Sequence, residues 1–122
     1  MTGRVTGLDH VQVAAPPGCE AEARRFYGEL LGMEEIEKPE ELRARGGAWF
    51  RCGAQQLHVG VEEEFMPALK AHPALAATQV GVLLDALERA GVAVTRDGER
   101  VYTADPWGNR LELVEAAPTS AR

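Results

Sequence analysis

The sequence is poor in cysteine, in long apolar runs and in net positive charge. Its 122 residues contain two cysteines, Cys19 and Cys52, without CxxC spacing, and two are too few for a disulfide framework. Free thiols are therefore expected. Cys19 precedes a predicted helix, where a thiol can become reactive, although a small buried apolar role is the commoner one. No segment approaches the ~20 apolar residues of a membrane span, and the first residues lack the apolar run of a signal peptide, which predicts a cytoplasmic protein.

The charge balance excludes two classes of partner. Thirteen basic and 19 acidic residues give a formal net charge of −6 at pH 7. Such a chain has no electrostatic footprint for nucleic acid or for an anionic membrane surface. A cationic small molecule suits this balance better than an anionic one. The length and an apolar fraction of 45% are ordinary for one compact domain.

Two stretches of the chain show the same order of predicted elements. In the first stretch, strands are predicted at residues 8–14, 33–38, 48–53 and 55–61, with an amphipathic helix at 20–31. In the second, strands are predicted at residues 72–77, 92–97, 100–105 and 109–115, with a helix at 80–90. Both read β-α-β-β-β. This pattern predicts an α+β fold of two paired βαβββ modules, about residues 6–61 and 72–116, joined by residues 62–71.

The three histidines of the chain all fall in predicted strands, on the face opposite the apolar residues. His58 in the segment QLHVGV alternates with leucine and valine, so it is expected outside the main core. His10 and His72 have small or polar company on their faces, and Glu112 alternates with two leucines in the last strand. All four residues therefore occupy the first or fourth strand of a module.

These four positions predict a metal site. If the two modules pair about a pseudo-twofold axis, the side chains of His10, His58, His72 and Glu112 converge on one point. Imidazole nitrogens with one carboxylate suit Zn, Ni, Co, Mn or Fe, whereas Ca prefers oxygen ligands. A lone strand histidine is more often a hydrogen-bonded, half-exposed residue. The prediction therefore depends on the coincidence of all four.

Five segments that together span nearly the whole chain carry a family resemblance: LDHVQVA, FYGELLGM, QLHVGV, HPALAA and DPWGNRLELVE. In this order they resemble the vicinal oxygen chelate superfamily, which includes glyoxalase I, fosfomycin-resistance enzymes, bleomycin-resistance proteins and extradiol dioxygenases. The resemblance implies one glyoxalase-like domain over residues 1–122, a U-shaped half-barrel and a homodimer. It also implies a divalent ion held by His10, His58, His72 and Glu112, which acts as a Lewis acid on two neighbouring substrate oxygens.

Two functions of different classes fit this resemblance. The first is a metal-dependent lyase or isomerase that acts on a small substrate with vicinal oxygens, in which Glu112 or His58 moves a proton. The sequence departs from common glyoxalase I, which has a carboxylate ligand where His58 stands. The second is a metal-free binding protein like the bleomycin-resistance proteins, with Trp49 and Trp107 lining an acidic cleft. A binding module without turnover is the third interpretation.

Few other residues can be assigned to the site. Gln12 shares the face of His10 and is a candidate to contact the substrate or the surroundings of the metal. The sequence does not decide which face of the sheet Arg51, Arg100 and Tyr102 occupy, because a shift of the strand by one residue moves every side chain to the opposite face. Fosfomycin-modifying members need cations around a phosphonate, and this chain has two lysines besides its arginines.

Overall fold

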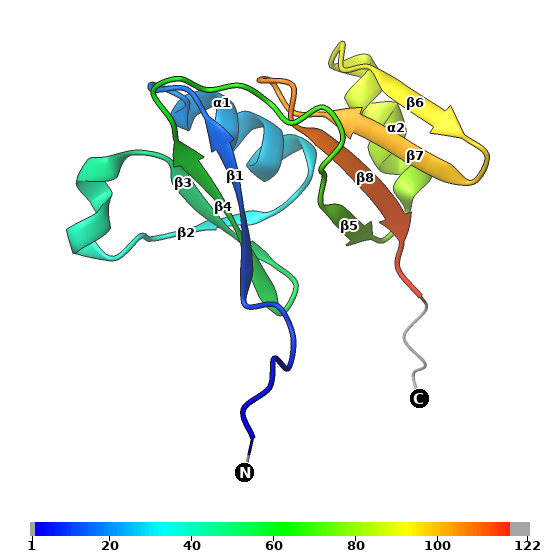
Figure 1. Ribbon diagram of the computed structural model, residues 1–122. Helices are drawn as coiled ribbons and strands as arrows, with labels where there is room; N and C mark the ends of the chain where they lie inside the picture. The colour runs from blue at the N-terminus through cyan, green and yellow to red at the C-terminus, as the bar shows by residue number, and fades with distance from the viewer. Residues whose placement is uncertain (1, 118–122) are drawn as a thin grey trace. The chain divides into compact units, whose positions relative to one another are not determined.

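The computed structural model describes residues 2–117 and divides into two compact units, Met1–Phe65 and Met66–Arg122 (Figure 1). Each unit contains a four-stranded mixed sheet, and its elements follow the order strand, helix, three strands. The α+β class and the two βαβββ modules are therefore confirmed. That the modules act as one domain stays a prediction.

The first unit places its first and last strands side by side. Its elements are β1 (His10–Ala15), α1 (Glu20–Ala23), the π-helical segment η1 (Arg24–Leu30), β2 (Glu34–Ile36), the 3₁₀ segment η2 (Glu40–Arg45), β3 (Ala48–Cys52) and β4 (Gln55–Val61). The sheet order is β1-β4-β3-β2. β1 runs parallel to β4, whereas β2, β3 and β4 form antiparallel pairs.

The second unit repeats this topology. Its elements are β5 (Ala74–Ala77), α2 (Val80–Arg89), β6 (Val94–Asp97), β7 (Arg100–Ala104) and β8 (Arg110–Glu115). The sheet order is β5-β8-β7-β6, with β5 parallel to β8. Within the described part of the chain, no helix has both the length and the apolarity to cross a membrane.

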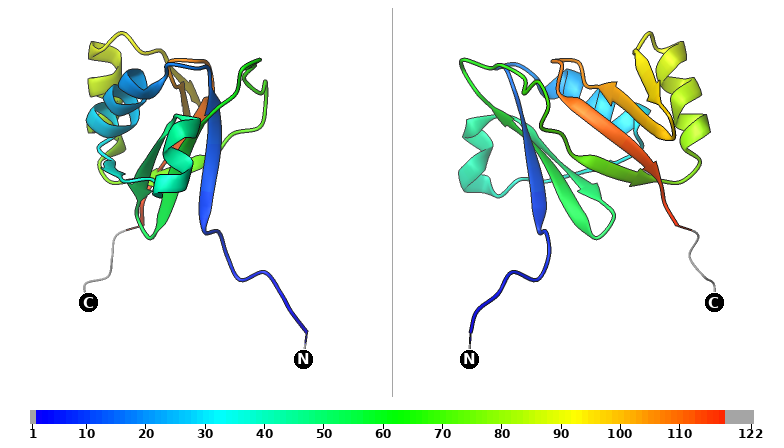
Figure 2. Two further views of the ribbon diagram at one scale, coloured as in Figure 1. Left: turned by 90° about the vertical axis from the view of Figure 1, so that its left-hand side faces the viewer. Right: turned by 45° about the vertical axis from the view of Figure 1, so that its right-hand side comes forward.

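The predicted helix at residues 20–31 forms, but its geometry changes along its length. From Arg24 the α-helical turns widen into a π-helix, and a glycine with φ of 80° follows the segment. The helix buries Phe26 and Tyr27, and the Tyr27 ring lies 5.9 Å from the ring of Phe50 on β3. Figure 2 shows the helix against one face of the first sheet. This face therefore carries the core of the unit.

Strand alternation gives the first sheet two different faces. Phe50 on β3 pairs with Leu57 on β4, and both are buried on the helix-covered side. The next pair, Trp49 and His58, points to the opposite side because side chains of a strand alternate between faces. The predicted register of His58 against the apolar stripe is thus the observed one.

A carboxylate from the last strand holds the start of the helix in the second unit. Both Glu115 side-chain oxygens accept hydrogen bonds, one from the backbone N–H of Gln79 at 2.9 Å and the other from that of Val80 at 3.0 Å. A helix leaves its first N–H groups without partners inside the helix, so this carboxylate replaces a local cap. The helix then buries Leu84 and Leu87.

The observed fold differs from the prediction around β5 and at η2. The strand expected at residues 72–77 begins only at Ala74, so His72 lies just before β5. Pro73 lacks the N–H needed to extend the ladder, although its carbonyl still accepts a bond of 3.1 Å from the backbone of Glu112. The 3₁₀ segment η2, by contrast, had no predicted counterpart.

Candidate metal and substrate site

The first unit brings two predicted metal ligands together. His10 lies on β1 and His58 on β4, and the parallel register pairs His58 with Gln12, two residues beyond His10. The two imidazole centroids are 4.2 Å apart, with their ring planes inclined by 18°. The first half of the predicted ligand set is therefore adjacent in space.

A tryptophan extends this pair into a stack of three rings. Trp49 stands opposite His58 on β3, and its indole lies 3.8 Å from the imidazole, with the planes at 3°. His58 is thereby enclosed between Trp49 and His10 and is only 4% exposed. His58 thus lies outside the main, helix-covered core, as expected, but aromatic rings bury it on the opposite face of the sheet.

Burial lowers the pKa of His58 below its ordinary 6.5, and the neighbouring His10 lowers it further. The neutral imidazole is therefore favoured near pH 7. Its Nε2 is 2.8 Å from the side-chain oxygen of Gln56. Since an amide oxygen only accepts, Nε2 carries the proton and Nδ1 keeps its lone pair.

His10 is oriented by the residue before it. Its Nδ1 donates to a carboxylate oxygen of Asp9 at 2.9 Å, which leaves Nε2 as the nitrogen with the lone pair in the neutral ring. Asp9 was not among the predicted site residues, and its signal in the sequence is only its position beside His10. The His10 side chain is 45% exposed, in contrast to that of His58.

The second unit brings the other two predicted ligands together. His72 Nε2 lies 3.2 Å from one Glu112 oxygen, while His72 Nδ1 donates to the backbone carbonyl of Lys70 at 2.9 Å. The second Glu112 oxygen accepts from Arg100 at 3.4 Å. Glu112 is 8% exposed, so this carboxylate is held inside the unit and not at its surface.

The structure decides the strand parity of Arg100 and Tyr102. Tyr102 pairs with Glu112 across β7 and β8, and its ring meets the His72 ring edge-on at a centroid distance of 5.6 Å. The guanidinium of Arg110 lies 4.1 Å above the Tyr102 ring. Both Tyr102 and Arg100 therefore lie on the face that carries Glu112. Arg51 lies on the Trp49 face of the first sheet, where it forms an exposed ion pair with Glu34.

Each unit thus supplies two of the four predicted ligands. Taken by itself over residues 2–117, neither unit gathers three or more His, Cys, Asp or Glu side chains in a group that could hold an ion. Binding by all four residues to one shared ion stays a prediction.

The motif DPWGN near the carboxyl end has a structural role. The buried carboxylate of Asp105 accepts hydrogen bonds from the backbone N–H groups of Trp107 and Asn109, at 3.1 and 2.8 Å, and from the Asn109 amide at 2.7 Å. The loop closed by Asp105 leads directly into β8. This motif therefore fixes the start of the strand that carries Glu112.

A pocket lies beside the histidine pair of the first unit. It has a volume of about 240 Å³. Its lining comes from β1, β3, β4 and the segment around η2: Gln12, Lys38, Leu42, Arg45, Gly46, Trp49, Val59, Gly60 and Val61. Trp49 belongs both to the pocket wall and to the ring stack. The pocket could not be anticipated because η2 was not predicted.

A sequence profile for the Glyoxalase/Bleomycin resistance protein/Dioxygenase superfamily matches residues 7–113. The chain belongs to this superfamily. The matched range includes all four predicted ligands and both halves of the repeated topology, so the resemblance seen in the five sequence segments is confirmed. No curated protein matches the chain.

Solved structures of the glyoxalase superfamily share the fold. A glyoxalase family protein from Bacillus anthracis is 51% identical, with a TM-score of 0.88 over 96% of this chain and 100% of that chain. Lactoylglutathione lyase from Agrobacterium tumefaciens is 20% identical, with a TM-score of 0.70 over 93% and 96% of the two chains. Fosfomycin resistance protein FosX from Listeria monocytogenes, in complex with Mn(II) and 1S,2S-dihydroxypropylphosphonic acid, is 16% identical, with a TM-score of 0.75 over 93% and 95%. The last two similarities concern the fold alone.

Proposed function

We propose that this glyoxalase superfamily member is a metal-dependent lyase or isomerase that acts on a small substrate with vicinal oxygens. In this proposal His10, His58, His72 and Glu112 hold a divalent ion of Zn, Ni, Co, Mn or Fe. We also propose that the protein is cytoplasmic and forms a homodimer. The observation that carries it is the hydrogen bonding of the three histidines.

Each histidine has one ring nitrogen within hydrogen-bond distance of an oxygen that can accept its N–H, so a neutral ring would have its lone pair on the other nitrogen. The acceptors are a carboxylate for His10, an amide oxygen for His58 and a backbone carbonyl for His72. A neutral imidazole has one donor and one acceptor nitrogen, so these contacts favour one tautomer for each neutral ring. Metal-binding histidines are usually oriented by such bonds to carboxylates or carbonyls. The donor set therefore suits a divalent transition metal.

The contact between His72 and Glu112 points the same way. With Nδ1 engaged as the donor to Lys70, the neutral ring presents the Nε2 lone pair to a carboxylate oxygen at 3.2 Å. Two acceptors face each other at this distance, which is unfavourable unless a cation lies between them. A divalent ion held by His72 and Glu112 would remove this conflict. A protonated imidazole is the competing explanation, and metal analysis separates the two.

The protein residues would share the remaining work. The ion, when bound, supplies Lewis acidity toward two adjacent substrate oxygens. Arg100 donates to one Glu112 oxygen, and the Glu112 carboxylate can accept a proton from the substrate. His58 has a lowered pKa and is neutral near pH 7, so in a site where its lone pair does not bind the ion it is the second candidate base. The rings of Trp49 and His10 shield His58 from water.

Metal content is the decisive measurement. We expect protein purified without a histidine tag, and incubated in turn with Zn, Ni, Co, Mn and Fe(II), to retain near-stoichiometric metal in elemental analysis. Glu112→Gln and His10→Gln should each lower that content, because each removes a donor while keeping the size of the side chain similar. Glu99→Gln, in the exposed turn between β6 and β7, is the matched control.

Absence of metal after every incubation would refute this proposal. The metal-free binding protein would then be the better explanation. Equal metal content in Glu112→Gln and Glu99→Gln would also refute the proposal, because Glu112 would then not be a ligand. Substrate screening should begin with α-hydroxy and α-keto compounds only once the metal is established.

A further inference from the structure

We propose that the pocket beside η2 binds an anionic group of the substrate, a carboxylate or a phosphoryl oxyanion, through Lys38 and Arg45. This assignment rests on the proposed function, because it names the substrate class of the same site.

The pocket forms where β3 separates from β4. At this end of the two strands the outermost pair is Ala48 of β3 with Val59 of β4. Beyond Val59, β4 pairs with β1 alone, up to Val61. Gly46 and Gly47 turn the chain away with φ values of 78° and 86°, a conformation that side chains disfavour. A Cβ on Gly47 would lie 2.1 Å from the carbonyl oxygen of Val59, so only glycine fits there. The space opened by this turn is bordered by η2.

Two cations line this space. The ammonium of Lys38 donates to the backbone carbonyl of Gly46, which holds it at the pocket and leaves two further N–H donors for a ligand. Arg45 also lines the pocket, and within residues 2–117 it forms no ion pair. Its planar guanidinium can bind both oxygens of a carboxylate or phosphoryl group at once.

One carboxylate lies near these cations without cancelling them. Glu20 accepts a hydrogen bond of 2.7 Å from the backbone N–H of Gly47, and this bond is the main cause that lowers the pKa of Glu20. Glu20 is therefore ionised, and Lys38 contributes to that shift. Glu20 does not line the pocket, and the charged side chains of the lining are those of Lys38 and Arg45, so the lining carries positive charge.

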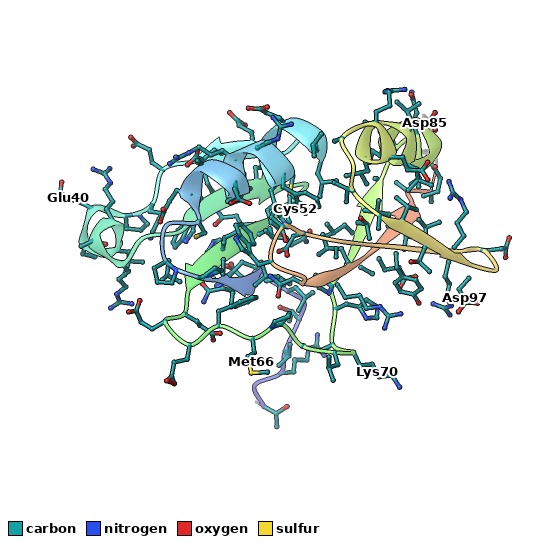
Figure 3. The ribbon with its side chains drawn as sticks, turned by 90° about the horizontal axis from the view of Figure 1, so that it is seen from above. Glu40, Cys52, Met66, Lys70, Asp85 and Asp97 are labelled. Carbon is teal, nitrogen blue, oxygen red and sulfur yellow. The ribbon has the colours of Figure 1, made fainter. Side chains whose placement is uncertain are left out.

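Neighbouring residues on the same segment show a different pattern. Arg43 lies 3.7 Å from the carboxylate of Glu37 and donates to the carbonyl of Lys38, so its charge is already paired. It does not line the pocket. Figure 3 shows η2, marked by Glu40, at the edge of the first unit. Arg43 therefore offers a matched control for Arg45 on one short segment.

The pocket also borders the ring stack. Trp49 lines the pocket and stacks on His58, and Gln12 lines it while pairing with His58 in the strand register. A substrate whose anion is held by Lys38 and Arg45 can thus extend along Trp49 toward the histidines. The volume of about 240 Å³ lies just below the usual range for ligand pockets, roughly 300 Å³ and upward, which favours a small substrate.

The local charge outweighs the net charge of the chain at this site. Six excess negative charges made a cationic ligand the better expectation from the sequence. Exposed charges farther away than about 8 Å are largely screened at physiological ionic strength, whereas groups that touch the ligand are not. The preferred sign of the ligand is therefore set by Lys38 and Arg45.

Equilibrium binding of small probe anions tests this assignment. In a Trp107→Phe background Trp49 is the remaining tryptophan, so its fluorescence reports on the pocket. We expect inorganic phosphate or glycolate to change this fluorescence saturably, and neutral glycolamide to have no effect. Arg45→Gln and Lys38→Gln should each weaken anion binding about tenfold or more, since each removes a charge-assisted hydrogen bond. Arg43→Gln should leave binding unchanged.

The outcomes separate the ligand classes and the two proposals. Response to phosphate alone indicates a phosphoryl group, and response to glycolate alone indicates a carboxylate. Absence of both responses, or equal binding by Arg45→Gln and Arg43→Gln, would overturn the assignment. Arg45 has no ion pair to lose, so circular dichroism should show that Arg45→Gln folds. Metal content measured on the same samples should not change, which distinguishes failure of this pocket from failure of the metal site.

Discussion

Replacing Gly47 by alanine should destabilise the first unit for two separable reasons. The backbone of Gly47 has φ of 86°, and an L-residue in left-handed conformation costs about 1–2 kcal/mol. The added Cβ would also lie 2.1 Å from the Val59 carbonyl oxygen, a backbone atom that cannot rotate away. Forcing an extra carbon into this close contact shifts the backbone and costs about 1–3 kcal/mol. We therefore expect Gly47→Ala to lower the free energy of unfolding by about 2–5 kcal/mol.

Gly53 provides a control for the first of these costs. Its φ is 59°, but a Cβ there would meet nothing within 4 Å. Gly53→Ala should therefore show only the conformational cost. Urea unfolding followed by Trp49 fluorescence in the Trp107→Phe background measures both variants. With a slope of about 1–3 kcal/mol per molar urea, the two midpoints should differ by roughly 1 M.

Equal midpoints for the two variants would refute this reasoning. They would mean that the β3–β4 junction yields to a methyl group, so that the pocket wall at Gly47 is not rigid. A large loss in both variants would instead show that the left-handed backbone alone dominates.

Three other predictions concern titration, helix capping and thiol reactivity. The pKa of His58 lies below 6.5 in the folded protein, so the unfolded chain binds more protons in acid and the free energy of unfolding should fall as the pH drops below 6.5. NMR titration of His58 and urea midpoints measured from pH 5 to 8 check this. Glu115→Gln should lower the stability of the second unit by about 1–2 kcal/mol in urea unfolding, unlike Glu99→Gln, because a charged cap becomes neutral. Burial raises the pKa of both Cys19 and Cys52, so a thiol reagent at pH 7 should react slowly until urea is added; fast labelling of folded protein would contradict this.

The order of elements could be predicted because its signals are local. Alternation in QQLHVGV predicted a strand at residues 55–61, and the observed β4 has these bounds. The apolar spacing and the following glycine likewise marked the helix of each unit. The segment η2 lacks such a period, because its six residues are exposed or half-buried and pack no regular apolar face.

The candidate site was predictable only in outline. Strand parity placed His10 and His58 on one face, and the parallel register makes them neighbours. The burial of His58 depends on Trp49, which arrives from another strand, so no pattern within β4 could reveal it. The acceptor for His72 is the backbone carbonyl of Lys70, which any residue type would provide. Such contacts follow from the path of the chain and leave no mark in the sequence.

The parallel pairing of β1 with β4, and of β5 with β8, bears on the order of folding. The hairpins of β3 with β4 and of β7 with β8 close over short loops, whereas His10 must find Gln56, and Ala74 must find Glu112, across most of a unit. Long-range closure costs more chain entropy than a hairpin, so the outer strands are expected to dock late. Each pair of predicted ligands joins an early hairpin to a late strand. Each half of the candidate donor set is thus assembled only when its unit has finished folding.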